Sequence, residues 1–529
     1  MPIRMVDDPG GPEDQFNDNN AGGRSGGGPG AGLLGLLPLL FSLFRGKRIF
    51  LLILILVGGY FILGRGGCNM SQLSSLATGG FLDPQQFAKA NIYEPLADDD
   101  SKNPLPEAAS LQKWAPDPGN QGQQGSCVAW SSAYAARSIL EAARTGTNAN
   151  QLRFSPSFLY NQIGLDGCQG SYIERAMEFM TKQGAVPYDA FPYDDKDCSR
   201  QPDMGLIREA EQYRMRGFTR LTVGDRNDQL DMRAIRENLS QGAPVVIGMM
   251  VGPSFMQPMM GKDVWEPEAG DEQMQGFGGH AMCVVGYDDS KYGGAFLLMN
   301  SWGPEWGHNG FAWVQYRYFK YFVKEAYGLE PMAPAGGAAN KPFDCELGLV
   351  QVNFDGNKMQ TAGYVQLRKT GEHVFETRSP LAMGTRFKME VKNNTECYVY
   401  VFGKETDGTS YTLFPYPLQD DRTKTHYSPF CGITGYRLFP RDKSMQPDSI
   451  GTRDEMALIV SLEPLDWASL NESFSQHPEQ DYAGRIEHVL GEKLSKEVSF
   501  SEDGKGTIHF TAAPAKDKLV ACIVAINKN

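Results

Sequence analysis

An uncharged apolar run near the N-terminus constrains the organisation of this chain more than any other feature. The run is sixteen residues long, at 49–64 (IFLLILILVGGYFILG), and basic residues flank it at Arg45, Lys47, Arg48 and Arg65. A helix of that length spans about 24 Å, slightly less than the hydrocarbon core of a bilayer, and flanking basic side chains can reach the headgroups. We therefore expect a transmembrane anchor at about 49–64 rather than a buried core helix or a cleaved signal peptide.

The charges beside this run predict its orientation. Three basic residues precede the run and one follows it, so the N-terminus is expected in the cytoplasm and the catalytic domain outside, in the periplasm or at the cell surface. Residues 1–32 are rich in Gly, Asn and Asp and show no helical or strand period. They predict a disordered cytoplasmic tail, followed by a hydrophobic segment at 33–65 that contains the anchor.

The remainder of the chain divides into two folded parts. With 529 residues, 41% of them hydrophobic, the chain is long enough to bury more than one core. Residues 66–103 and 332–343 are predicted linkers, and between them residues 104–331 mix helical and strand patterns. Residues 344–529 show short alternating apolar runs between turn signals, which predicts a β-rich domain. The net charge of −13 provides no broad basic surface, so no nucleic-acid partner is expected.

A cysteine, a histidine and an asparagine, in that order, are the candidate catalytic residues. Cys127 precedes a helix-forming stretch that ends near Gly146, which places the thiol at a helix N-terminus, where the helix dipole favours thiolate. His280 follows two glycines and starts an apolar strand, and Asn300 follows a second apolar run. A lone cysteine with a distant histidine and asparagine is typical of a nucleophilic Cys-His-Asn site.

Three motifs resemble the signature blocks of papain-like cysteine peptidases. They are QGQQGSC at 121–127, GHA at 279–281, and NSWG at 300–303 with WG at 306–307. The resemblance covers roughly 104–330 and is closest in style to bacterial members of the family. It implies an α+β catalytic domain of two lobes with a cleft between them. The helical lobe is expected at about 120–215 and the β-barrel-like lobe at about 216–330, with one transmembrane helix before the domain and a β-rich domain after it.

The resemblance also implies a role for each catalytic residue. Cys127 would attack the scissile carbonyl and form a thioester, and His280 would pair with the thiol and protonate the leaving amine. The side chain of Asn300 would orient the histidine ring, and Gln121 would donate to the oxyanion. Trp302 is expected to cover the histidine–asparagine bond. The function predicted in this way is a membrane-anchored cysteine endopeptidase acting on proteins or peptides.

By the same resemblance, substrate is expected along Gly170 and Ser171, where the family has two glycines. The pocket for the second residue before the cleaved bond is expected to carry no charge, and Trp302 is counted with the substrate-binding residues. The residues expected to line that pocket are Tyr172, Ile173, Gly248 and Gly279.

Two cysteines resemble halves of the family's disulfides whose usual partners are absent. Gln124 stands where the family usually has the partner of Cys168, and Cys198 also lacks its usual mate. We expect Cys168 and Cys198 to pair with each other, which an extracytoplasmic location would permit, and the alternative is two free thiols.

Other kinds of site find no support in the sequence. No metal-binding or nucleotide-binding motif is present, so no metal and no cofactor are expected. Residues 396–417 resemble a β-rich domain that bacteria append to peptidases, and we expect this domain to bind a protein or envelope component. The family's long helical pro-region is not visible, so regulation is expected to depend on the short linker or on the C-terminal domain.

Two alternatives to peptide hydrolysis stay open. An amine could replace water as the acyl acceptor, which would make the protein a transpeptidase-like acyltransferase. A catalytically dead peptidase fold could serve as a binding protein, although all four candidate catalytic residues are present.

Overall fold

The computed structural model describes residues 2–9, 77–274, 276–332, 335, 343–476, 481–502, 504, 506–513 and 519–529. The predicted anchor at 49–64 and the rest of the hydrophobic segment 33–65 lie outside the described residues, as do residues 10–32 of the predicted tail. Within the described ranges, no helix is long and apolar enough to cross a membrane.

The helices of the catalytic half form one lobe, as predicted for residues 120–215. A continuous helix begins at Cys127 and consists of α5 (Cys127–Ala129), the π-helix η5 (Trp130–Arg137) and α6 (Ser138–Thr145). Gly146 ends it with a φ of 70°, a left-handed conformation that glycine adopts at low cost. The helices α7 (Pro156–Ile163) and α8 (Ile173–Lys182) pack against this helix, and α9 (Met204–Ala210) follows them.

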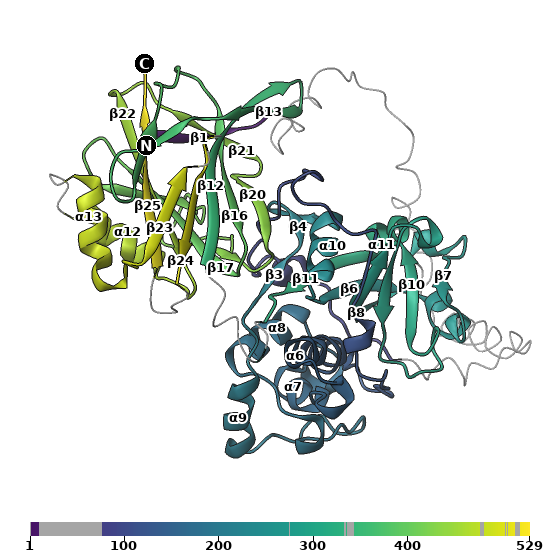
Figure 1. Ribbon diagram of the computed structural model, residues 1–529. Coiled ribbons are helices and arrows are strands. Elements are labelled where there is room, and N and C mark those ends of the chain that lie inside the picture. The colour runs from purple at the N-terminus through teal and green to yellow at the C-terminus, as the bar shows by residue number, and fades with distance from the viewer. Residues whose placement is uncertain are drawn as a thin grey trace, which may run out of the picture. The chain divides into compact units, whose positions relative to one another are not determined.

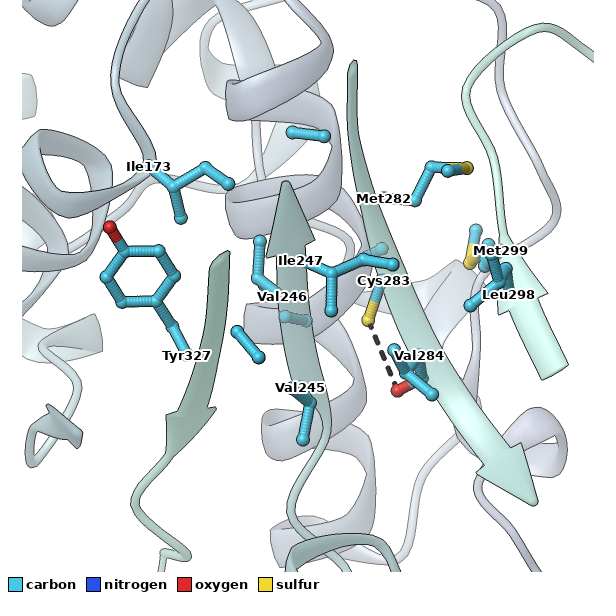
Figure 2. Packing of buried hydrophobic residues seen from close by; sticks show 14 of the residues in the cluster. Ile173, Val245, Val246, Ile247, Met282, Cys283, Val284, Leu298, Met299 and Tyr327 are labelled. Carbon is cyan, nitrogen blue, oxygen red and sulfur yellow. Dashed lines mark hydrogen bonds between the residues drawn. The ribbon is translucent and has the colours of Figure 1, made fainter. Parts of the chain in front are cut away.

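The second lobe is a mostly antiparallel sheet, as the α+β prediction requires. Its strand order is β3-β11-β6-β8-β9-β10-β7, with β2 paired to β8. The sheet is packed between η5 on one side and α10 (Met232–Ser240) on the other, so the central strand β6 is apolar on both faces. Figure 2 shows Val245, Val246 and Ile247 of β6 between β8 and Tyr327 of β11, with Ile173 of α8 close by. The strand bounds are β2 Ala108–Ser110, β3 Phe218–Arg220, β6 Val245–Val251, β7 Val264–Trp265, β8 Gly278–Asp288, β9 Ala295–Met299, β10 Phe311–Gln315 and β11 Val323–Leu329, and α11 is Tyr316–Phe322.

The C-terminal part is a sandwich of two sheets, which confirms the predicted β-rich domain. One sheet has the order β1-β21-β16-β12-β24-β23 and the other β14-β15-β25-β22-β17-β18. Side chains alternate along β17: Val399 and Val401 lie in the core between the sheets, and Tyr400 and Phe402 lie in a second core with α12 (Trp467–Ser475) and α13 (Tyr482–Leu490). Figure 1 shows both helices beside this second sheet. The strands include β12 Phe343–Asp355, β14 Leu367–Lys369, β15 Val374–Thr377, β16 Phe387–Asn393, β17 Cys397–Lys404, β18 Ser410–Phe414, β19 Phe430–Cys431, β21 Lys443–Pro447, β22 Arg453–Ser461, β23 Val498–Glu502, β24 Ile508–Ala512 and β25 Leu519–Asn527.

The first residues of the chain form a strand, so the predicted disorder of residues 1–32 is wrong for 3–7. Strand β1 (Ile3–Asp7) pairs antiparallel with β21 at the edge of the first sheet. Ile3 is fully buried, and its N–H donates to the Tyr411 hydroxyl over 3.0 Å. Five residues are too few for a period to stand out from polar surroundings, and the partner strand lies near the other end of the chain.

Residues 77–103, most of the predicted linker 66–103, are packed into the protein. They include the short helix α4 (Pro84–Phe87), and Phe87, Ile92 and Leu96 are buried. The N–H of Ile92 donates to the His426 carbonyl over 2.6 Å, so the segment bonds to the C-terminal domain. Its large apolar residues stand singly or in pairs among polar residues, Pro and Gly, which is why no period indicated that they are buried.

Candidate active site

The candidate nucleophile lies where the two lobes meet. Cys127 begins the long helix and is fully buried. Its Sγ accepts a hydrogen bond of 3.4 Å from the N–H of Ala281, which directly follows His280 on β8. The thiol of the helical lobe is therefore placed against the strand that carries the candidate base.

The candidate base is held by an amide and an indole. His280 Nε2 lies 2.7 Å from Asn300 Oδ1, and Trp302 stacks on the imidazole with ring centroids 4.3 Å apart and planes inclined by 20°. Asn300 Oδ1 can only accept, which favours the tautomer protonated at Nε2. Nδ1 has no hydrogen-bond partner among the described residues, so it is the ring nitrogen available to take a proton from a nucleophile.

Gln121 is fixed by Ser301, a residue that the sequence did not single out. Gln121 Oε1 accepts from the Ser301 hydroxyl over 2.7 Å, and the Gln121 N–H donates to the Ser301 carbonyl over 2.8 Å. Gln121 Nε2 donates to the Gln124 carbonyl over 2.9 Å. An amide nitrogen carries two hydrogens, so one remains for a developing oxyanion. The signal for Ser301 was its place in the motif, between Asn300 and Trp302.

Polar side chains hold the loop before Cys127 in place. The Tyr193 hydroxyl lies 2.6 Å from Ser126 Oγ and 3.2 Å from Gln124 Oε1, and it donates to the Gln121 carbonyl over 2.8 Å. Gln124 Nε2 donates to the Asp194 carbonyl over 3.3 Å. These bonds connect the loop before Cys127 to residues 193–194. No motif around Tyr193 in the sequence indicated that it would make these bonds.

Cys168 and Cys198 form a disulfide, which confirms the expected pairing and excludes the two free thiols. The disulfide links the loop before Gly170 and Ser171 to the loop that contains Cys198. The other cysteines among the described residues are free and buried. Cys397 and Cys431 face each other across β17 and β19.

A segment of the chain itself lies in the cleft. Ser171 pairs with Gly80 in parallel. The Ser171 N–H donates to the Gly79 carbonyl, and the Ser171 carbonyl accepts from the Phe81 N–H, both over 3.0 Å. The Gly80 N–H donates to the Gly279 carbonyl over 3.1 Å. We call residues 77–83 the cleft segment. At its start, Trp302 Nε1 donates to the Ala77 carbonyl over 2.8 Å.

Leu82 of the cleft segment fills the predicted pocket. A Cβ at Gly248 would collide with Leu82 and lie 3.3 Å from Ile173 Cδ1, and a Cβ at Gly279 would lie 3.1 Å from Leu82 Cγ. Three of the four predicted pocket residues therefore surround one leucine. The fourth, Tyr172, instead packs against Phe81, with ring centroids 5.9 Å apart.

The pocket is expected to carry no charge, but a buried acidic side chain, whose pKa burial raises to about 7, lies beside it. Glu325 pairs with Gly248 across β11 and β6, and its Cβ lies 3.5 Å from the position of a Cβ on that glycine. The carboxylate is 3% exposed and accepts from the Asp83 N–H over 2.9 Å and from the Tyr327 hydroxyl over 3.1 Å. Glu325 is far from every catalytic motif in sequence, and only the sheet register brings it to the pocket.

Burial controls the ionisation of the covered site. It raises the pKa of Cys127 to about 12, against the opposing effect of hydrogen bonds from backbone N–H groups, those of Ala281 and Gly80 among them. Burial also lowers the pKa of His280 to about 4, although the bond to Asn300 favours the charged ring. Both groups are therefore neutral at pH 7 while the cleft is covered, because burial disfavours each charged form. In this state burial outweighs the helix N-terminus that predicted a thiolate.

No group of three or more His, Cys, Asp or Glu side chains that could hold a metal ion occurs in the part of the chain that the structure describes.

Comparison with known proteins identifies both folded parts. Residues 112–329 match the family model "Papain family cysteine protease", and residues 381–428 match a domain of unknown function, DUF4384. Human cathepsin L2 is 27% identical over 43% of this chain, and an uncharacterised peptidase C1-like protein of Acanthamoeba polyphaga mimivirus is 30% identical over 38%. The chain spans 64% of the length of each of these relatives. Xylellain, a cysteine protease from Xylella fastidiosa, has a solved structure with a TM-score of 0.40 and 21% identity, covering 49% of this chain and 96% of its own.

The bond between Ser301 and Gln121 generates a first test. Ser301→Ala should lower kcat/KM about tenfold, less than the 10²–10³ lost with an oxyanion donor itself, because Gln121 stays present but less well held. Rates on a fluorogenic peptide, with thermal unfolding as a check on folding, measure this. Ser290→Ala, at an exposed turn, is the control, and equal rates for the two variants would contradict the positioning role.

Proposed function

Because residues 112–329 form a papain-family cysteine protease domain, we propose that this chain is a membrane-anchored cysteine endopeptidase. The observation that carries the proposal is the 2.7 Å bond between His280 and Asn300 beneath the stacked Trp302, adjoining the thiol of Cys127 at the start of a helix. These are the groups that acyl transfer through a thioester requires.

The proposed reaction follows from the bonds of each side chain. His280 Nδ1 takes the Cys127 proton, and the sulfur attacks the scissile carbonyl carbon. The resulting oxyanion accepts from the Cys127 N–H and from the remaining Nε2 hydrogen of Gln121. When the C–N bond breaks, the leaving amine takes the proton from His280 and a thioester remains. Water then attacks the thioester, again with His280 as base, and releases the acid.

The direction of the cleft segment favours inhibition over cleavage. A substrate with its second residue before the cut in the Leu82 pocket would run from that pocket past Cys127 toward Trp302. The cleft segment runs the opposite way, from Ala77 at Trp302 to Leu82 in the pocket. A reversed backbone presents its carbonyl and leaving nitrogen on the wrong sides of the thiol. We therefore propose that residues 77–83 hold the enzyme latent.

The same proposal accounts for the neutral catalytic pair. When the cleft segment leaves, water reaches the Cys127 thiol and the His280 imidazole. Burial then no longer raises the pKa of the thiol or lowers the pKa of the imidazole. The helix N-terminus and Asn300 then favour the thiolate and the imidazolium, as the sequence indicated.

Membrane attachment through residues 49–64 is part of the proposal, with the catalytic domain outside the cytoplasm. This orientation has a structural consequence, because a single span places its two flanks on opposite sides of the membrane. Strand β1 precedes the span and β21 follows it, so the two strands can pair only when they share one side. The observed pairing of β1 with β21 therefore opposes this orientation, and tags at the two ends of the chain decide between them.

Replacement of the nucleophile tests the activity directly. With the cleft segment released by Leu82→Asp, the chain should cleave casein and be labelled by an epoxide active-site probe. Cys127→Ala in the same background should do neither, because neither the thioester nor the probe adduct can form. Mass spectrometry should locate the label on Cys127. Cys283→Ala, which removes a buried thiol outside the cleft, is the matched control. A released chain that neither cleaves nor becomes labelled would fit the dead-scaffold alternative, and an aminolysis product with added amine would identify an acyltransferase.

Release of the cleft segment should activate the enzyme. Leu82→Asp removes the apolar contact and places a second carboxyl near Glu325. Fully burying a leucine contributes roughly 1.5–3 kcal/mol. Leu82 is partly buried, so loss of its contact together with the added carboxyl should raise kcat/KM about tenfold. Gln85→Ala, at an exposed position of α4, should leave it unchanged. Equal activity of the two variants would contradict latency, and cleavage of the unchanged chain within 77–83 would contradict the reversed direction.

Tags at the two ends test the membrane orientation. The basic residues before the apolar run predict that a tag after Asn529 is accessible on spheroplasts and that a tag before Met1 becomes accessible only after lysis. Accessibility of both tags on intact spheroplasts would overturn this orientation and would agree with the pairing of β1 and β21.

A further inference from the structure

A cavity of about 340 Å³ lies in the C-terminal domain where residues 93–95 pack against it. Glu94, Leu413, Tyr416, Tyr427 and Pro440 are among the residues that line it. None of its lining residues belongs to the active site, so its role does not depend on the proposed peptidase activity.

The buried carboxylate of Glu94 is the unusual feature of this cavity. Glu94 is 4% exposed, and neither carboxylate oxygen has a hydrogen-bond partner among the described residues. Burial raises its pKa to about 8. A buried carboxylate without a partner is costly to the fold, and such groups are usually paired or hydrogen-bonded.

The nearby cations do not supply the missing partner. Arg422, Arg441 and Lys443 line the cavity, but none of them bonds to the Glu94 carboxylate. Arg441, Arg437 and Lys388 all influence the charge of Glu94, but each is committed elsewhere. Arg441 pairs with Asp231 over 2.6 Å. Arg437 donates to the Asn393 side chain and to the Ile433 carbonyl. It also donates to the main-chain carbonyl of Glu94, not to its carboxylate. Lys388 pairs with Asp8 over 2.6 Å and also donates to main-chain carbonyls. A fourth neighbour, Asp442, opposes ionisation of Glu94.

Aromatic side chains form a wall of the same cavity. Tyr416 and Tyr427 pack edge to face with ring centroids 4.7 Å apart and planes inclined by 85°. The buried Tyr416 hydroxyl has no hydrogen-bond partner within the described ranges. Ring faces attract cations, and a carboxylate beside them adds a counter-charge.

We propose that this cavity binds a small organic cation, an ammonium compound whose positive group pairs with Glu94 and whose alkyl part lies against Tyr416 and Tyr427. An anionic ligand would be repelled by an ionised Glu94, and an uncharged one would leave Glu94 protonated, whereas an ammonium group stabilises its charged form. The cavity thus assigns a ligand class to a domain whose family match gives no function.

Calorimetric titration of the full detergent-solubilised chain tests this site with matched probes. n-Butylammonium chloride and choline chloride carry the charge, and 1-butanol and 3,3-dimethyl-1-butanol are their uncharged counterparts. At least one ammonium probe should bind saturably, and its uncharged counterpart should bind at least tenfold more weakly. Sodium chloride at equal concentration controls for ionic strength. Equal binding of alcohol and ammonium, preferential binding of sodium acetate, or no binding of either ammonium probe would overturn the proposal.

Two variants locate the binding. Glu94→Gln should weaken ammonium binding at least tenfold, whereas Glu372→Gln, at an exposed position of the same domain, should not. Glu94→Gln should also unfold at nearly the same temperature without ligand at pH 7, because burial raises the pKa of Glu94 to about 8 and the carboxyl is already mostly neutral. Tyr416→Leu keeps Glu94 and should weaken choline binding by removing a ring face. Unchanged ammonium binding in Glu94→Gln would refute the site. If Glu94→Gln fails to fold, unchanged binding in Tyr416→Leu would refute it instead.

Discussion

The burial of Cys127 and His280 under residues 77–83 is the constraint on which the account of this protein depends. Burial disfavours both charged forms, so it moves the two pKa values apart and keeps the pair neutral. The bonds that hold His280 and Gln121 do not involve the cleft segment, because their partners are Asn300 and Ser301. In the proposed latent state the cleft segment therefore acts by covering the pair and excluding water.

The cleft segment continues into a part of the chain that joins the two folded domains. After α4, the Ile92 N–H bonds to His426 of the C-terminal domain, and the Tyr93 N–H bonds to the Arg220 carbonyl of the sheet lobe over 3.1 Å. Glu94 follows directly and lines the cavity of the C-terminal domain. One continuous segment thus contacts the catalytic cleft, the sheet lobe and the proposed cation site.

The sequence predicted the parts of this structure that local motifs encode. The lobes and the Cys168–Cys198 bond follow from the resemblance to papain-like peptidases, and the β-rich domain follows from its alternating apolar runs. The structure places Gln121, Cys127, His280 and Asn300 in one site. Glu325 and Tyr193 could not be predicted, because only the sheet register and loop packing bring them there. Strand β1 and the cleft segment were missed because short, irregular segments gain their structure from distant partners and carry little periodic signal of their own.

The pH dependence of Cys127 alkylation in the unchanged full chain tests the central claim most directly. Iodoacetamide reacts with thiolate, and a buried thiol with its pKa raised to about 12 supplies little of it near neutrality. Modification, located by mass spectrometry on Cys127, should be slow from pH 5 to 8 and should accelerate only at higher pH. Rapid modification that is independent of pH between 5 and 8 would show a persistent thiolate–imidazolium pair and would contradict the latent, neutral site.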